Sequence, residues 1–120
     1  MNVYVSRDSV AVGDDIDAPH GRTISLPDER QVDEVLSEIL ESGYLPKIAG
    51  GRATWSVVSN IPLAVVAQQW TEPRLLPLIV ERSEELDRQQ NGLRIHFNYH
   101  AQIDPEIVYE VFCGFRLTAH

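Results

Sequence analysis

The sequence predicts an α+β fold: a single domain over residues 1–120, with a mainly antiparallel sheet and two or three helices packed on one of its faces. Three observations support this class. The length and the 43% hydrophobic content suit one core in one ordinary domain. Several short segments carry strand patterns between turn residues. Two segments show helical spacing but do not alternate regularly with the strands, which disfavours a doubly wound parallel sheet.

The N-terminal third predicts three short strands and one helix. Residues 3–6 and 9–13 are rich in valine and flank a turn at Arg7-Asp8, and residues 22–26 alternate in polarity. A helix is expected over residues 30–42, entered at Pro27-Asp28-Glu29 with Asp28 as a possible N-cap, and ended by Gly43. Apolar residues spaced three and four apart form one stripe along it: Val32, Val35, Leu36, Ile39 and Leu40.

The middle of the chain predicts a hairpin. Residues 53–59 and 63–70 are both rich in β-forming residues, and Asn60-Ile61-Pro62 separates them. Between residues 74 and 90 the pattern is ambiguous between helix and strand, and we favour a helix that begins near Pro77.

The C-terminal part predicts a strand and then a helix. Residues 92–100 alternate strictly, with apolar Leu93, Ile95, Phe97 and Tyr99 on one side. Asp104-Pro105-Glu106 opens the helix, which uses Val108, Val111 and Phe112 as its apolar face. Residues 115–120 are expected to form a last short strand.

Composition excludes several classes of protein. No apolar run is long enough for a membrane span, and the first residues do not resemble a secretory signal. Together with the single cysteine, these features predict a cytoplasmic protein. The net charge of −8 disfavours binding to nucleic acid and to anionic membranes.

The negative charge is concentrated near the N-terminus. Residues 1–42 hold ten acidic and three basic residues, a balance of −7, whereas the remainder is close to neutral. Such an asymmetry suits a cationic partner, and it equally suits a role in solubility.

The segment Gly13–His20 has the sequence GDDIDAPH and allows four interpretations: a metal site, a catalytic loop, a solvated loop, or a contact surface for a basic protein. Calcium loops place the glycine after the first acids and add a distant glutamate, and His20 is the one nitrogen ligand nearby. We predict neither a metal nor a cofactor. As a contact surface, the segment would use Asp14, Asp15 and Asp17.

The helix over residues 30–42 extends the acidic surface. Glu34, Glu38 and Glu41 lie on one side of it, and like charges at this spacing destabilise a helix by roughly 0.2–0.5 kcal/mol per pair. No Lys or Arg between residues 31 and 46 offsets them. These glutamates are therefore predicted to bind a partner, and Trp70, in a polar setting, is predicted to anchor the rim.

An alternative function uses the polar side of the strand over residues 92–100. Arg94, His96, Asn98 and His100 share that side and include residue types that handle protons or phosphate. This face is a candidate for a small enzyme or a ligand-binding protein. No nucleophile elbow, phosphate loop, dinucleotide fingerprint or zinc spacing is present, so we predict no catalytic residue and favour a protein that is not an enzyme. A third option is a homo-oligomer formed through a strand edge.

In type, the chain resembles the small immunity proteins of bacterial toxin–immunity systems, including those of contact-dependent growth inhibition. The resemblance lies in its size, its acidity, its α+β pattern and its lack of catalytic motifs, and it carries over no single residue. It implies a tight inhibitory complex with a basic toxin domain, such as a nuclease. The three aspartates and three glutamates named above would then cover the toxin's basic surface.

Overall fold

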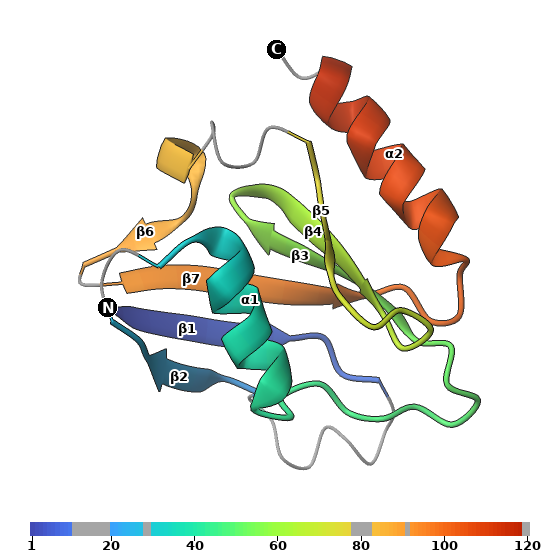
Figure 1. The fold of residues 1–120 in the computed structure, drawn as a ribbon, viewed down its shortest axis with the longest axis horizontal. Helices are drawn as coiled ribbons and strands as arrows, with labels where there is room; N and C mark the ends of the chain where they lie inside the picture. The colour runs from blue at the N-terminus through green and yellow to red at the C-terminus, as the bar shows by residue number, and fades with distance from the viewer. Residues whose placement is uncertain (11–19, 28–29, 78–82, 91, 119–120) are drawn as a thin grey trace.

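A seven-stranded sheet forms the centre of the structure (Figure 1). The structure is a computed structural model, and it describes residues 1–10, 20–27, 30–77, 83–90 and 92–118. The strands follow the order β2-β1-β7-β3-β4-β5, and β6 pairs with β7. Their bounds are β1 Asn2–Arg7, β2 Arg22–Ser25, β3 Thr54–Ser59, β4 Ile61–Ala67, β5 Arg74–Leu75, β6 Arg88–Gln89 and β7 Gly92–Tyr99. The helices are α1, Val32–Glu41, and α2, Pro105–Thr118, with one 3-10 turn, η2, at Ser83–Glu85.

The sheet is mainly antiparallel, and this confirms the predicted α+β class. One pair differs, since β1 runs parallel to β7, with Val5 opposite Ile95. The predicted hairpin is present as β3 and β4, which turn at Asn60 with a positive φ of 64°. The predicted strand over residues 92–100 is present as β7, and Ile95 and Phe97 are fully buried.

Helix α1 covers one face of the sheet and builds the main core. Its side chains Val35, Leu36 and Ile39 are buried together with the inward side chains of β1, β3 and β7. At its start, the Gln31 amide donates to Glu34 Oε1 at 3.1 Å. At its end, Gly43 adopts a φ of 74°, as predicted for a helix stop.

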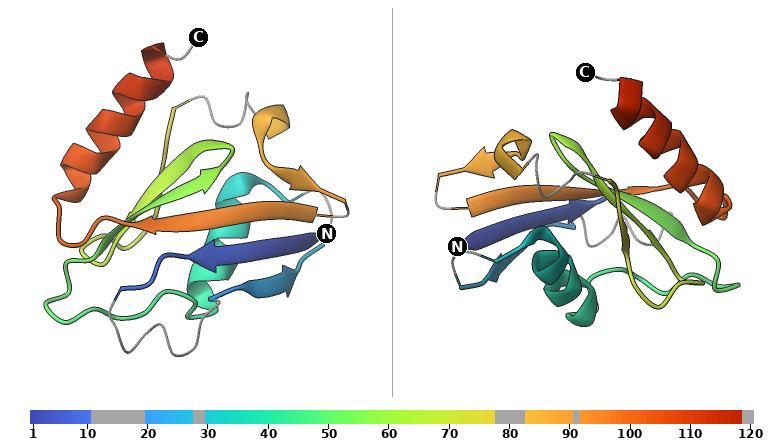
Figure 2. Two further views of the ribbon diagram at one scale, coloured as in Figure 1. Left: turned by 180° about the vertical axis from the view of Figure 1, so that it is seen from behind. Right: turned by 45° about the horizontal axis from the view of Figure 1, so that its top comes forward.

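Helix α2 packs against the opposite face of the sheet, over β3 and β4 (Figure 2, right). Thr54 donates from Oγ1 to the Ile103 carbonyl at 2.7 Å, and the Phe112 ring meets the His100 ring edge-on at 6.1 Å. Thr54 alternates with Trp55, whose side chain belongs to the core beneath α1. The helices therefore lie on different faces, where the sequence analysis expected one, because β3 and β4 are buried on both sides.

Several local predictions need correction. Ser9 and Val10 are not part of a strand, and residues 11–13 of that predicted strand lie outside the described part of the chain. The helix expected from Pro77 is wrong where it can be seen, since β5, η2 and β6 occupy the described residues. Helix α2 continues to Thr118, so the last strand predicted for residues 115–120 is wrong over residues 115–118, and residues 119–120 lie outside the described part of the chain. The N-cap of α1 is Gln31, and Asp28 is not described.

Candidate functional site: two surfaces and a polar sheet face

The acidic surface of α1 consists of Asp33, Glu34, Glu38 and Glu41. Three of these side chains are exposed, and Glu38 is half-buried. Asp14, Asp15 and Asp17, predicted to extend this surface, lie outside the described residues. The structure therefore places the predicted glutamates on the solvent side of one helix.

Arginines from outside the helix meet both ends of this surface, which the sequence analysis did not foresee. Arg30 Nη1 lies 3.1 Å from Glu34 Oε2. Arg22, from β2, donates to the Ser42 carbonyl at 3.4 Å and to its Oγ at 3.2 Å, next to the C-terminus of α1. A cation suits that end of a helix dipole. The arginines therefore approach α1 from outside residues 31–46, at its two ends, and among the described residues Glu38 in the middle of the helix forms no ion pair with a cation.

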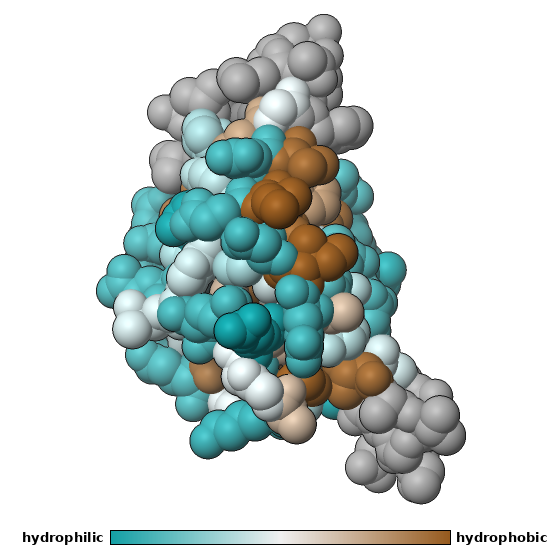
Figure 3. All heavy atoms as spheres, turned by 90° about the vertical axis from the view of Figure 1, so that its right-hand side faces the viewer, coloured by the Kyte–Doolittle hydropathy of each residue, from teal (hydrophilic) through white to brown (hydrophobic). Residues whose placement is uncertain are grey.

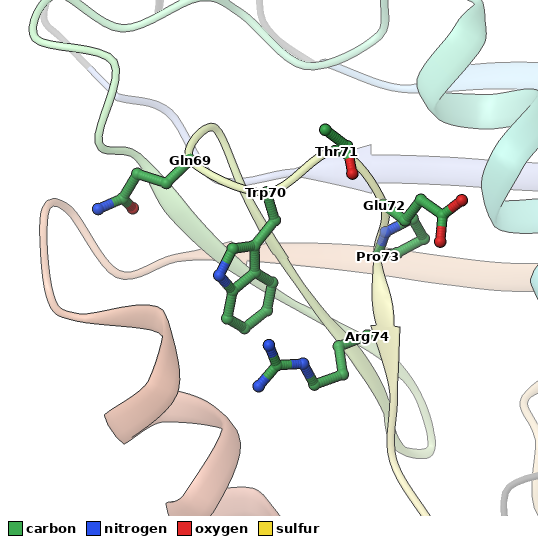
Figure 4. Close-up of a pocket in the computed structure, with 6 residues that line it drawn as sticks. All are labelled: Gln69, Trp70, Thr71, Glu72, Pro73 and Arg74. Atoms are coloured by element: carbon green, nitrogen blue, oxygen red, sulfur yellow. The ribbon is translucent and has the colours of Figure 1, made fainter.

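Trp70, the predicted anchor, lies on the other side of the sheet, in the loop between β4 and β5. The Arg74 guanidinium stacks over its indole ring at 4.0 Å and continues to Glu106 of α2, with Nη1 2.7 Å from Oε2. Figure 4 shows the Trp70 and Arg74 side chains pointing toward one another while Glu72 points away. The loop lines a shallow, open hollow of about 450 Å³ between Gln69 and Arg74.

An apolar stripe runs along the outer side of α2 beside this loop. Ile103, Ile107 and Val111 are 50%, 54% and 62% exposed, and Figure 3 shows hydrophobic side chains gathered on this side of the molecule. The sequence analysis assigned Val111 to the inward face with Val108 and Phe112, and this is wrong. The signal was available, since residues 103, 107 and 111 repeat every four positions.

The predicted partner-binding residues therefore do not form one surface. The α1 glutamates lie over one face of the sheet. Trp70 lies beside α2 on the opposite face, held there through Arg74, Glu106 and the bond from the Tyr109 hydroxyl to the Leu75 carbonyl at 2.9 Å. A partner that covers Trp70 meets α2, not α1.

The polar side of β7 carries a hydrogen-bonded chain of three side chains. Ser6 Oγ lies 2.8 Å from His96 Nδ1, and His96 Nε2 lies 2.9 Å from Asp8 Oδ1. The carboxylate can only accept, so in a neutral imidazole the proton sits on Nε2 and Nδ1 accepts from the Ser6 hydroxyl. The Asp8 carboxylate also accepts from the Tyr99 amide at 2.9 Å, which fixes its position.

Electrostatics favour the charged form of Asp8. Burial raises the pKa of Asp8, but the Tyr99 amide and His96 lower it by more, so it lies below its ordinary value. Serine polarised by a histidine that a carboxylate orients is the arrangement used for nucleophilic catalysis. Here the carboxylate meets Nε2 and the serine meets Nδ1, and about 37% of the His96 side chain is exposed.

A second polar group lies further along β7. His100 Nε2 lies 2.8 Å from Ser56 Oγ, and Asn98 Nδ2 donates to the same oxygen at 3.4 Å. Burial lowers the pKa of His100, an effect partly offset by Asp8, and this favours the neutral imidazole. Arg94 is exposed two residues before His96. The face predicted as the alternative site is thus assembled, and the structure adds Ser6, Asp8 and Ser56.

Ser6 and Asp8 were missed because the sequence analysis placed Asp8 in a turn, and strand alternation alone gives no partner for Ser6. Their partner, His96, comes from the parallel pairing with β7, which no local pattern reveals. Over the described residues, no three His, Cys, Asp or Glu side chains are grouped so as to hold a metal ion. None of the helices described is long and apolar enough to cross a membrane.

No protein-family model matches the chain, and no curated protein or solved structure matches it either.

Proposed function

We propose that this chain is a protein-binding module whose partner is a basic protein. Within that class, we propose that it acts as an immunity protein that neutralises a basic toxin domain by covering its active or substrate-binding surface. The toxin would act in the cytoplasm, and a nuclease is an example, because its surface is cationic in order to bind phosphates.

One observation carries this proposal: the acidic surface of α1 faces solvent. Asp33, Glu34 and Glu41 are exposed, and arginines reach only the ends of the helix. Like charges along one side weaken a helix, so this arrangement does not favour the helix itself. A concentrated negative field does accelerate docking with a cationic protein and helps to select it.

The test begins with recovery of the partner from the native host and continues with association kinetics. The variant Glu38→Lys/Glu41→Lys leaves Glu34 to support the start of α1. We expect it to lower the association rate constant at least about tenfold at low salt, with the difference shrinking toward 0.5 M salt as the charges are screened.

The control is Glu84→Lys/Glu85→Lys, which changes net charge equally at exposed positions away from α1. It should lower the rate constant much less. If both variants slow association to the same extent, only net charge matters and the α1 surface is not the docking site. If neither slows it, or the partner is not basic, the proposal fails.

The second candidate function is nucleophilic chemistry at Ser6. The geometry of Ser6, His96 and Asp8 favours it, because the hydroxyl donates to a histidine oriented by a carboxylate.

A fluorophosphonate probe tests this candidate. The Ser6 oxygen would attack phosphorus, fluoride would leave, and the hydroxyl proton would pass to His96 Nδ1. Intact-protein mass spectrometry should then show one adduct that is lost in Ser6→Ala and slowed in Asp8→Asn. An unmodified wild-type protein would remove this candidate without affecting the binding proposal.

A further inference from the structure

The outer side of α2 presents three large aliphatic side chains to solvent. Ile103, Ile107 and Val111 are each at least half exposed, and they are the exposed large hydrophobic residues of the described chain. Ile107 and Val111 lie four residues apart on α2, and Ile103 lies in the turn that leads into the helix, so the stripe covers that turn and the first two turns of α2. Single exposed apolar residues are ordinary, but a contiguous group marks an interaction site.

The fold does not need this stripe. The inward side of α2 is already filled by Val108, which is buried, by Phe112 against His100, and by Tyr109, which donates to the Leu75 carbonyl. The helix thus has two apolar sides, of which packing on the sheet uses one. The second side is available to another molecule.

Charge identifies the kind of molecule. The exposed acids Asp104, Glu106 and Glu110 alternate with the stripe residues along the sequence, whereas the one basic residue of α2, Arg116, lies beyond Val111 in the last turn. Arg74, the cation beside the helix, is bound to Glu106. A second copy of this chain would bring these acids against their own counterparts, which is repulsive. A partner with aliphatic side chains ringed by Lys and Arg would complement both features.

We propose that the α2 stripe is the docking surface for an aliphatic patch ringed by basic residues on the partner protein. This inference rests on the proposed function for the sign of the partner's charge. It also extends that function: α1 lies over the opposite face of the sheet, so the partner would meet the acids of α1 with one part of its surface and the α2 stripe with the adjacent Trp70 with another.

Three synthetic helical peptides of about 18 residues probe the surface. The first has a leucine stripe flanked by lysines, the second replaces the lysines by glutamates, and the third replaces the leucines by glutamines. Amide chemical shifts of the ¹⁵N-labelled protein report where each one binds. We expect the leucine–lysine peptide to shift amides of residues 103–114, the leucine–glutamate peptide to shift none, and the lysine–glutamine peptide to shift α1.

Two variants sharpen the result. Ile107→Ser should weaken binding of the leucine–lysine peptide about five- to tenfold. The reason is that the peptide would bury the exposed half of the Ile107 side chain, and serine offers no such apolar contact. Ile107→Leu keeps the apolar contact and should retain the affinity. Neither variant should change binding of the lysine–glutamine peptide.

Other outcomes would overturn the inference. The stripe is not the docking surface if the leucine–lysine peptide leaves residues 103–114 unshifted and shifts only α1, and the acidic proposal then survives alone. Self-association at tens of micromolar that Ile107→Ser abolishes would show that a second copy covers the stripe. If α2 responds as expected but the lysine–glutamine peptide shifts nothing on α1, the docking role of α1 fails while the α2 surface stands.

Discussion

Gly92 and Gly114 allow one substitution to be tested in two opposite settings. A Cβ at residue 92 would lie 2.2 Å from the Asn2 carbonyl oxygen and 2.9 Å from Tyr4 Cε2. Ordinary contact begins near 3.4 Å, so β1 would have to move by about 1 Å relative to β7. The atom in the way is backbone and cannot rotate aside. We expect Gly92→Ala to destabilise the protein by about 2–3 kcal/mol, the range of an overpacked core.

At Gly114 the same methyl group meets no atom within 4 Å. The residue lies inside α2, where alanine is favoured over glycine by about 0.8–1.0 kcal/mol. Because the helix ends four residues later, we expect Gly114→Ala to stabilise by about 0.5–1 kcal/mol. Urea unfolding followed by circular dichroism measures both variants. A loss below about 0.5 kcal/mol for Gly92→Ala would refute the close approach of β1 to β7, and a loss of stability for Gly114→Ala would refute the open setting of Gly114.

Three further predictions concern stability. Asp8→Ala removes the acceptor for the Tyr99 amide and His96, and should cost about 1 kcal/mol at pH 7 after allowance for solvent screening. Because the pKa of Asp8 is lowered on folding, this deficit should be full above its ordinary value of 3.8 and vanish as pH falls through the folded value; a deficit that persists at pH 2 would contradict it. Asn60→Ala should cost about 1–2 kcal/mol by urea unfolding and Asn60→Gly much less, since φ is 64° there; equal losses would argue against a conformational cause. Phe97→Ala should cost about 3–5 kcal/mol, as expected for a fully buried ring, and a loss under 1 kcal/mol would place Phe97 outside the core.

Local patterns were sufficient for the elements whose burial is one-sided. Helix α1 has a single apolar stripe, and Gly43 follows its C-terminus; β7 alternates apolar and polar residues over eight positions. In both elements the buried residues follow the period of the sequence pattern. The start of α2 was also predictable, because the Glu106 amide bonds to Asp104 Oδ1 at 2.9 Å, as an N-cap requires.

Features that depend on distant pairing were not predictable in this way. Nothing local shows that β1 lies parallel to β7, and this pairing is what brings Ser6 to His96. The outward stripe of α2 was not predicted because Val111 also fits the spacing of the inward residues Val108 and Phe112. Likewise, the cation at the C-terminal end of α1 is Arg22 of β2. This residue lies too far from the helix in the sequence for a local helix pattern to include it.

The position of β7 has a consequence for folding during synthesis. It lies between β1 and β3 in the sheet, yet it is the last strand to be made. Until residue 99 has left the ribosome, the β1–β2 and β3–β4 hairpins have no strand to join them, and each leaves an unpaired edge. We expect the nascent chain to stay open to proteases until β7 has emerged, and the sheet then to fold in one step.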